Sequence, residues 1–507
     1  MAKYCTTLCI IVAVCLTPAA FAETKTETEY LAILLEGKKI GHAEHTRILE
    51  KGKVTTQEQV IMMLGRGGQA VKIESSETHI EAADGTPLGF EMRQNMSGLE
   101  QKRTGVIADG KVTVTIEAAG DPQKMTMDWP KGALLSEGMR LLQEKRGLKE
   151  GEVYDADIFR PDMMLAIKAQ VAVGKKTTVD LFGREVELTE VKVTMQIPGQ
   201  PITVTSYVDD ALKAFKTLVP MMGMTMEMID CDKAFALRDD DVVDFLDRLS
   251  VKSPSELTDI GNKASIQYEL TPTCENGLIL PTTSNQTVQK DKERVVVTVV
   301  PYVPKTDTPL PYAGDNAEAL AALKPTEYLQ SADAKIKELT HAAIGTTSET
   351  LKAARQIESF VKGYIITKDL SVGYATAAEV AQSRQGDCSE HAVLTAAMCR
   401  AAGIPARVVC GIVYADTFIG QKSVFGGHMW TEVFVENAWV GLDATRAPKG
   451  FGPGHISLAV GDGNPSDFFS LVNTLGCFKI DKITVIEKKK TPEPKGQTDA
   501  DQNLQGS

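Results

Sequence analysis

Residues 386–392 read Gly-Asp-Cys-Ser-Glu-His-Ala, and this stretch decides the fold of the C-terminal half of the chain. Two later stretches complete it, Gly-His-Met-Trp at residues 427–430 and Gly-Leu-Asp-Ala-Thr at residues 441–445. The first stretch opens an expected helix, and the other two lie on neighbouring expected strands. Together they supply a candidate thiolate nucleophile, its base and a group that orients the base, namely Cys388, His428 and Asp443.

The segment that follows Cys388 is apolar and rich in alanine, and it predicts a helix that ends at Gly403 and Pro405. A cysteine in the first turn of a helix lies beside unpaired backbone N–H groups and the positive end of the helix dipole. Both favour the thiolate over the thiol, whose unperturbed pKa is about 8.5. A buried strand is expected next, at residues 407–413.

Two further strands are expected at residues 424–435 and 439–443, and they form an antiparallel pair around Asn437. His428 lies nine residues before this turn and Asp443 six residues after it. The two side chains can meet only if the register contains a β-bulge or an offset.

The run Gly-Asp-Cys-Ser-Glu-His-Ala, Gly-Ile-Pro-Ala-Arg-Val-Val, His-Met-Trp-Thr-Glu-Val-Phe and Trp-Val-Gly-Leu-Asp-Ala-Thr resembles the core of the transglutaminase-like superfamily over about residues 340–450. This superfamily includes protein cross-linking transglutaminases, bacterial cysteine peptidases and peptide N-glycanases. The resemblance implies a papain-like α+β fold in which Cys388 is the nucleophile, His428 the base and Asp443 the residue that orients the base.

The sequence departs from the animal cross-linking enzymes in two ways. Those enzymes use a tryptophan well upstream of the cysteine to bind the oxyanion, whereas tryptophan occurs here only at positions 129, 430 and 439. An acidic calcium loop of the animal type is also missing, so a calcium-dependent cross-linking activity is disfavoured. One oxyanion donor can be the backbone N–H of Cys388. The second is left open among Gln382, Gln385 and Tyr364.

Each candidate also has a structural interpretation. Cys388 is alternatively a buried thiol, His428 a core histidine and Asp443 a hydrogen-bonding residue at a strand end. His391, one helical turn after Cys388, is a rival base that lacks an obvious carboxylate partner. Asn437 and Glu432 are rivals of Asp443 for the role of orienting the base. We expect Trp430 and Trp439 to form walls of the cleft and Arg407 to be a structural ion-pair partner.

The chain has 507 residues, too many for one core, and two to four domains are expected. Alternating runs between turn signals make its N-terminal half β-rich, with a short helix near residues 134–144. Residues 30–41 resemble an opening strand pair of periplasmic β-domains found beside such cores. The expected fold class is α+β, with antiparallel β-regions before the papain-like core. The expected division is a signal peptide (1–22), a β-rich domain (23–240), a small β-region with a linker (241–320), the catalytic domain (321–480) and a disordered tail (481–507).

The N-terminus has the features of a secretory signal, with Lys3, an apolar stretch at residues 8–16 and a small-x-small cleavage site that ends at Ala22. An uncleaved anchor is the alternative, and lipid attachment at Cys15 is disfavoured by the bulky Val14. We expect export to the periplasm or the outside of the cell, with no membrane span after cleavage. A net charge of −12 argues against nucleic acid as a partner.

Six cysteines follow the signal, namely Cys231, Cys274, Cys388, Cys399, Cys410 and Cys477. If Cys388 stays a thiol, at least one other cysteine is unpaired, and a bridge between Cys399 and Cys410 is conceivable. Cysteine and histidine spacings show no zinc pattern. The alternating methionines at 222, 224, 226 and 228 indicate an apolar strand face, and Asp239, Asp240 and Asp241 indicate a cap for a helix at 241–249. We expect no metal and no cofactor.

We therefore expect an exported cysteine-dependent hydrolase or acyltransferase that acts on protein or peptide amides through a thioester. Hydrolysis is favoured because nothing in the sequence supplies a dry tunnel for an amine. The alternatives are a protein-glutamine cross-linking enzyme and a non-catalytic envelope protein that uses the core as a scaffold. The N-terminal domain is alternatively a lid over the cleft, and the oligomeric state is left open.

Overall fold

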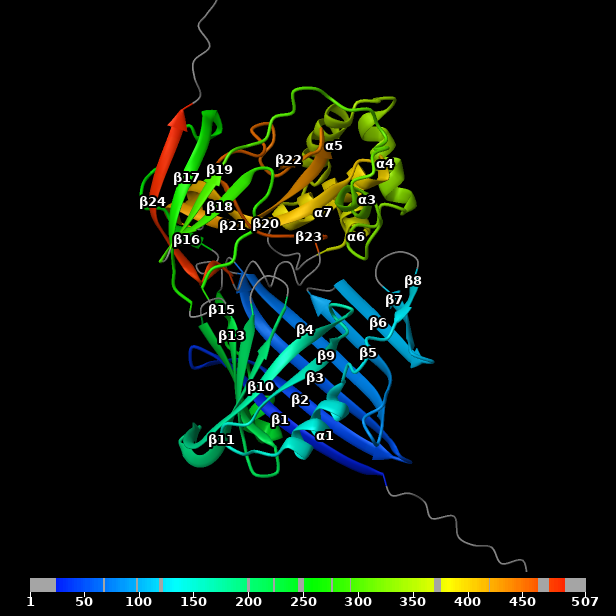
Figure 1. The fold of residues 1–507 in the computed structure, drawn as a ribbon, viewed down its shortest axis with the longest axis vertical. Coiled ribbons are helices and arrows are strands. Elements are labelled where there is room, and N and C mark those ends of the chain that lie inside the picture. Colours follow the sequence, from blue (N-terminus) through cyan, green and yellow to red (C-terminus); the bar gives the residue numbers. More distant parts are fainter. Residues whose placement is uncertain are drawn as a thin grey trace, which may run out of the picture.

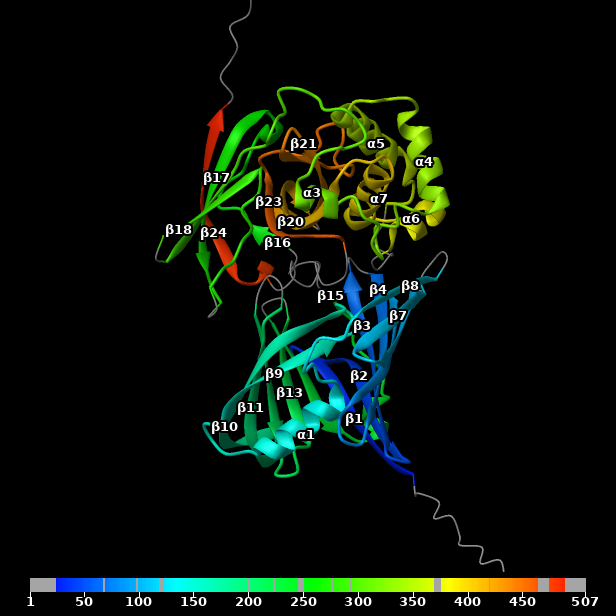
Figure 2. The same cartoon turned by 45° about the vertical axis from the view of Figure 1, so that its right-hand side comes forward.

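The computed structural model describes residues 24–487, apart from residues 67–68, 97–98, 118–121, 198–200, 222–223, 245–249, 275–276, 292, 369–374, 419 and 464–473. A large curved antiparallel sheet, blue to green in Figure 1, lies below a second region that holds two smaller sheets and several helices. The turned view in Figure 2 shows the same two regions one above the other. The predicted signal peptide lies outside the described residues. Within them, a helix with the length and apolar character needed to cross a membrane is not found.

The large sheet contains fifteen strands, and nearly all neighbours in space are neighbours in sequence. Its strands are β1 (Lys25–Leu35), β2 (Lys38–Glu50), β3 (Lys53–Arg66), β4 (Gln69–Ala82), β5 (Pro87–Met96), β6 (Leu99–Ala108), β7 (Lys111–Glu117), β8 (Gln123–Asp128), β9 (Val153–Arg160), β10 (Leu165–Leu181), β11 (Arg184–Met195), β12 (Ile202–Val208), β13 (Ala214–Met221), β14 (Met224–Cys231) and β15 (Val243–Asp244). Strand β1 pairs with β14 and so joins the two halves, while β15 adds to β3 in parallel. The expected antiparallel β-rich region is confirmed.

Helix α1 (Ser136–Arg146) is the predicted interruption of these strands. Its first turn is fixed by the buried Glu81 on β4, whose carboxylate accepts the N–H groups of Glu137 and Gly138 at 2.6 and 2.9 Å. A carboxylate at this end of a helix is favourable because it faces unpaired N–H groups and the positive end of the dipole.

The second region combines a five-stranded and a four-stranded sheet with helices. The five-stranded sheet has the order β16 (Ser250–Lys252), β21 (Gln421–Val435), β20 (Ala406–Phe418) and β23 (His455–Gly461), with β22 (Ala438–Leu442) paired to β21. The other sheet has the order β18 (Gln286–Asp291), β19 (Arg294–Val299), β17 (Lys263–Pro272) and β24 (Phe478–Glu487). The helices of this region are η2 (Ile260–Asn262), α3 (Ala317–Ala321), α4 (Ala334–Ile344), α5 (Thr350–Tyr364), α6 (Ala377–Ser383) and α7 (Cys388–Ala401). The short helix α2 (Lys233–Ala236) instead contacts β1 and β2 of the large sheet.

One hydrophobic core unites the two smaller sheets with the helices. It extends from Val251 on β16 to Ile480 on β24 and includes Ile357 of α5 and Leu394 of α7. The expected small β-region and the expected catalytic domain therefore pack as one unit.

The predicted disordered tail begins too early. Residues 481–487 form the second half of β24, which pairs with β17 along its length. Ile480 is buried, and Ile483 and Val485 pack against the core in the alternating pattern of a strand. Residues 488–507 lie outside the described part of the chain.

The predicted helix at residues 241–249 is also wrong where the structure describes it. Val243 and Asp244 form β15 instead, residues 245–249 lie outside the described part, and the acidic run caps no described helix. Asp240 pairs with Lys39.

The apolar interpretation of the methionines is confirmed, since Met224, Met226 and Met228 pack against the core of the large sheet. Met222 is outside the described residues.

The disulfide joins Cys274 to Cys477, beside the paired ends of β17 and β24. The bridge considered between Cys399 and Cys410 does not form. The two residues lie on α7 and β20, each fully buried among apolar side chains. Cys388 is likewise outside any disulfide, and so is Cys231.

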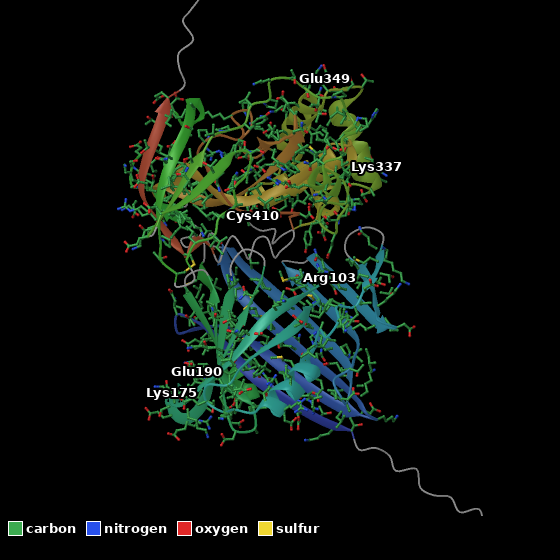
Figure 3. All side chains as sticks on the ribbon, in the orientation of Figure 1. Arg103, Lys175, Glu190, Lys337, Glu349 and Cys410 are labelled. Carbon is green, nitrogen blue, oxygen red and sulfur yellow. A yellow bond between two sulfur atoms is a disulfide. The ribbon has the colours of Figure 1, made fainter. Side chains whose placement is uncertain are left out.

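The two regions are joined by polar contacts between β6 and the segment that precedes α4. Arg103 donates to the carboxylate of Glu327 at 2.6 Å, and the hydroxyl of Tyr328 donates to Gln101 at 2.6 Å. Arg103, Gln101 and Tyr328 are buried. Figure 3 labels Arg103 where the large sheet approaches the second region.

Candidate active site

The turn before α7 fixes the position of Cys388. Asp387 caps the helix by accepting the N–H of Ser389 at 3.0 Å, and the side chain of Glu390 accepts the N–H of Asp387 at 2.9 Å. Gly386 has a φ of 142°, and a Cβ there would lie 2.2 Å from the Cβ of Glu390. Only glycine fits this position. Cys388 is thus the first residue of α7, half-buried, at the positive end of the helix dipole, which favours a thiolate.

Helix α7 packs across β21, the strand that carries His428. The hydroxyl of Thr431 on β21 donates to the carbonyl of Ala392 at 2.9 Å, one turn along α7 from Cys388. This bond ties the start of the helix to the part of the strand that holds the histidine.

His428 and Asp443 meet through an offset in the register, which was one of the two predicted solutions. Strands β21 and β22 pair without a bulge, with Thr431 opposite Leu442, around a turn in which Glu436 and Asn437 both have positive φ. Asp443 follows β22 directly, so His428 is its diagonal neighbour. The Nε2 atom of His428 lies 2.9 Å from Oδ2 of Asp443.

Asp443 is almost completely buried, with 1% of its surface exposed. Burial raises the pKa of its carboxyl, but attraction to His428 and hydrogen bonds from His428 and His455 outweigh it and hold the pKa well below its usual value. Its backbone N–H donates to Glu358 on α5 at 2.7 Å. Asp443 is therefore an ionised acceptor in a fixed position.

His455, the first residue of β23, is a site residue that sequence reasoning missed. Its Nε2 atom lies 3.0 Å from the same Oδ2 of Asp443. Burial lowers the pKa of His455, although its bond to Asp443 acts in the opposite direction. Glu358 was missed as well. Neither contact has a local signal, because both depend on packing between elements that are not consecutive.

Ligand atoms of His428, Asp443 and His455 all lie within 4.8 Å of one another, a spacing that would also suit a metal ion. Imidazole and carboxylate are ligands that zinc accepts. Both Nε2 atoms are at hydrogen-bond distance from one carboxylate oxygen, which accounts for the cluster as a hydrogen-bonded chain.

The rival candidates have other partners. Nδ1 of His391 contacts the carbonyl of Asp387 at 2.5 Å, and burial lowers its pKa. Glu432 accepts from Arg407 at 2.6 Å and from Asn285 at 2.8 Å, so the predicted ion pair of Arg407 is confirmed. Asn437 lies in the turn after β21.

The two tryptophans differ in position. The ring of Trp430 lies 6.3 Å from that of His428 and 5.2 Å from that of His455, centre to centre. Trp439 belongs instead to a separate apolar cluster. The guanidinium of Arg407 lies over its ring, 4.0 Å from the ring centre of Trp439. Only Trp430 therefore adjoins the candidate site.

The residues considered as second oxyanion donor have different surroundings. The hydroxyl of Tyr364 donates to the carbonyl of Ala381 at 2.7 Å and is therefore engaged elsewhere. Gln382 and Gln385 are exposed, on the segment that leads to Cys388.

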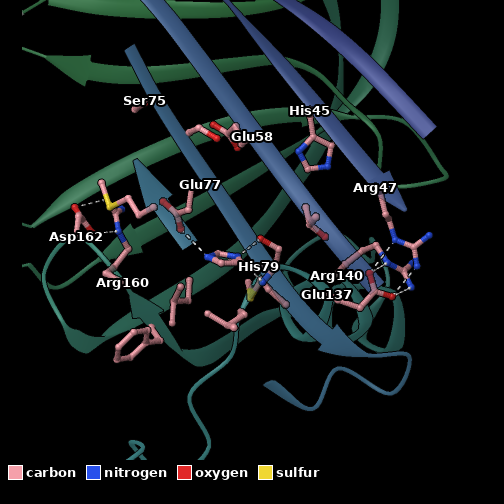
Figure 4. Close-up of a pocket in the computed structure, with 18 of the residues that line it drawn as sticks. His45, Arg47, Glu58, Ser75, Glu77, His79, Glu137, Arg140, Arg160 and Asp162 are labelled. Atoms are coloured by element: carbon pink, nitrogen blue, oxygen red, sulfur yellow. Dashed lines mark hydrogen bonds and ion pairs between the residues drawn. The ribbon is translucent and has the colours of Figure 1, made fainter. Parts of the chain in front are cut away.

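A second candidate site is a cavity of about 650 Å³ inside the large sheet (Figure 4). Glu137 is bound there by Arg47 and Arg140, both at 2.8 Å, and Arg160 pairs with Asp162 at 2.8 Å. The full set of charged and histidine residues in its wall is His45, Arg47, Glu58, Glu77, His79, Glu137, Arg140, Arg160 and Asp162. Such a wall suits a polar ligand.

Comparison with known proteins supports the interpretation of the C-terminal half. Residues 337–444 match the family model described as the transglutaminase-like superfamily. None of the curated proteins compared with the chain matches it.

Solved structures show distant likenesses. A proposed cysteine protease from Cytophaga hutchinsonii is 17% identical with a TM-score of 0.30, over 45% of this chain and 91% of that one. A β-barrel-like protein with a domain of unknown function from Brucella abortus is 13% identical with a TM-score of 0.31, over 42% and 97% of the two chains. A proposed protease from Parabacteroides distasonis is 10% identical with a TM-score of 0.19, over 71% and 69%. These likenesses are too distant to assign an activity. On the family match, the chain contains a domain of the transglutaminase-like superfamily.

Proposed function

We propose that the protein is an exported cysteine-dependent enzyme that cleaves protein or peptide amides through a thioester, with Cys388, His428 and Asp443 as its catalytic residues. The observation that carries the proposal is the bond of 2.9 Å between His428 and the ionised Asp443, on strands packed beside the helix that Cys388 opens. The match to the superfamily model over residues 337–444 supports it.

The proposed reaction begins with transfer of the thiol proton of Cys388 to His428. Since Nε2 of His428 is bonded to Asp443, Nδ1 is the nitrogen that takes this proton. The sulfur attacks the amide carbonyl, and the oxyanion accepts hydrogen bonds from donors that include the N–H of Cys388. The imidazolium returns the proton to the leaving amine as the C–N bond breaks, which leaves a thioester.

Water completes the cycle in the hydrolytic reaction. His428 takes a proton from the water molecule, and the hydroxide adds to the thioester. The C–S bond then breaks as His428 returns the proton to the sulfur, which gives a carboxylic acid and the thiol of Cys388. Asp443 keeps its charge throughout and stabilises the imidazolium, as its low pKa requires. A papain-like arrangement of α7 against β20 and β21 is part of the proposal.

Export is proposed from the N-terminal signal and agrees with the disulfide between Cys274 and Cys477. Disulfides persist in oxidising compartments such as the periplasm and the cell exterior. The proposed partners are protein or peptide substrates.

Alkylation of Cys388 by iodoacetamide tests the proposal directly. An ion pair with His428 makes Cys388 react faster below pH 7 than an ordinary thiol. Free cysteine, with a thiol pKa of about 8.5, is the reference. Cys231 is unsuitable for this purpose because burial raises its pKa. The enhanced rate should disappear in a His428→Ala variant. Equal alkylation rates of Cys388 in the wild type and in the His428→Ala variant would refute the proposed enzymatic function.

Incubation with a glutamine-containing peptide then identifies the reaction by mass. Fragments indicate proteolysis, and a gain of about one dalton, as expected when an amide becomes an acid, indicates deamidation. Addition of a supplied primary amine would indicate the alternative, a cross-linking enzyme.

A second candidate function is ligand binding by the β-rich region without catalysis, favoured by its charged cavity of about 650 Å³. In that case the core acts as an envelope scaffold. An inert Cys388 together with saturable binding of a polar envelope component, lost when Glu58 and Glu77 are replaced by glutamine, would support this function.

A further inference from the structure

The charge of Asp443 is shared between two buried histidines, of which the proposed reaction uses only one. Oδ2 of Asp443 lies 2.9 Å from Nε2 of His428 and 3.0 Å from Nε2 of His455. We infer that His455 is a positioning residue that acts through Asp443 to set the orientation and the basicity of His428. This inference rests on the proposed function.

The shared oxygen explains how His455 influences the base. A carboxylate oxygen that accepts two N–H bonds is less basic than one that accepts a single bond, because each donor stabilises its charge. Asp443 is consequently a weaker partner for an imidazolium at His428 than it would be alone. The second donor also limits rotation of the carboxylate, which keeps its bond to His428 aligned.

His455 can provide this bond without adding a second positive charge. Burial lowers its pKa, so the ring is neutral near pH 7 and uses Nε2–H as the donor. Its Nδ1 atom lies 3.2 Å from the backbone nitrogen of Gly452 and 2.9 Å from the carbonyl oxygen of the same residue, and in this tautomer it accepts the N–H. The ring is held between those of Phe451 and Trp430, at centre distances of 4.7 and 5.2 Å.

Other charged and titratable groups approach the cluster from the packed elements without touching Oδ2 in the described structure. Glu358 on α5 accepts the backbone N–H of Asp443, and the backbone N–H of Arg446 donates to Oδ1 at 3.2 Å. The charge of Arg446 contributes to lowering the pKa of His455, and the charge of Asp443 acts to raise the pKa of His391 on α7, which burial lowers. Cys388 opens the same helix. A change at His455 therefore alters one bond to Oδ2 and leaves these groups in place.

Two substitutions separate the hydrogen bond from simple packing. His455→Leu removes the donor and keeps an apolar side chain, whereas His455→Gln keeps an N–H donor at a similar reach. Ile456→Ala is the matched control, since Ile456 is fully buried on the same strand and its loss affects packing alone.

The readout is the titration of His428, followed by NMR with histidine labelled in the imidazole ring. We expect the pKa of His428 to rise by about half to one unit in His455→Leu, because Asp443 becomes more basic. It should stay near the wild-type value in His455→Gln and in Ile456→Ala. Peptide hydrolysis should fall about tenfold in kcat for the leucine variant, because the carboxylate of Asp443 is no longer held in line with His428. KM should be unchanged, and kcat should recover in the glutamine variant.

Three results would overturn the inference. They are an unchanged His428 titration in His455→Leu, an equal shift in the leucine and glutamine variants, and loss of activity on treatment with a chelator. If the leucine variant does not fold, His455→Asn replaces it, because the shorter amide cannot reach Oδ2. Failure of the proposed function is recognised separately, since wild-type Cys388 would then alkylate like an ordinary thiol whatever His428 does.

Discussion

Replacing Asp443 by asparagine tests the centre of the proposed mechanism. The side chain keeps its shape but loses the charge that stabilises an imidazolium at His428. In the structure its carboxylate accepts bonds from His428 and His455 on Oδ2 and from the backbone N–H of Arg446 on Oδ1. Because its pKa is far below the usual value, the carboxylate is ionised at every pH at which the protein would be assayed.

The expected loss can be estimated from the bond to His428. A hydrogen bond to a charged group contributes about 1.5–3 kcal/mol. Since about 1.4 kcal/mol corresponds to a factor of ten, losing this contribution in the transition state slows the reaction about 10- to 150-fold. The reduction should appear in kcat, because Asp443 is buried behind His428 and does not contact the substrate in the proposed reaction.

The assay combines peptide hydrolysis with the rate of Cys388 alkylation at pH 6–8. Asp462→Asn is the matched control, since Asp462 pairs with Arg400 near the far end of α7 and undergoes the same chemical change. Circular dichroism and thermal unfolding establish that both variants are folded. An Asp443→Asn enzyme that is folded and retains wild-type alkylation and turnover would refute the assigned role of Asp443.

Three further predictions concern stability. Gly386→Ala should lower the free energy of unfolding in urea by about 1–3 kcal/mol because of the backbone conformation, and further because of the contact with Glu390. Gly420→Ala, where an added Cβ would meet open space, should lower it by the backbone contribution alone. Glu137, whose pKa is lowered to about 2 by its arginine partners despite burial, contributes at most about 3 kcal/mol above pH 4.5. The stability difference between the wild type and Glu137→Gln should therefore vanish as pH falls from 4.5 to 2, and a difference that grows on acidification would contradict it. Cys274→Ser should lower the free energy of unfolding by about 2–5 kcal/mol and abolish the response to dithiothreitol; a variant as stable as the wild type would show that the bridge contributes nothing.

The site was predictable where its geometry is local. Cys388 precedes an apolar, alanine-rich segment that ends at Gly403 and Pro405, so the sequence places Cys388 at the start of a helix without further information. His428 and Asp443 were found because a short turn joins their strands, and the required offset follows from counting residues around it.

The missed residues depend on the order of elements in space. His455 on β23 reaches Asp443, which follows β22, across the two strands that lie between β23 and β22, namely β20 and β21. Glu358 arrives from α5, a helix that precedes Cys388 in the chain. The predicted start of the disordered tail at residue 481 was wrong for the same reason, because the strand partner of β24 is β17, about 200 residues earlier in the chain.

The closing strand determines which part of the chain can be studied alone. Because β16, β17 and β24 share one core with α5 and α7, a shortened protein that begins at residue 320 or stops at residue 480 would expose the edge of a sheet and one wall of that core. A fragment intended to fold by itself must start before Ser250 and continue through Glu487, with both Cys274 and Cys477 included. An affinity tag attached close behind Glu487 would adjoin this strand, so a spacer belongs between them.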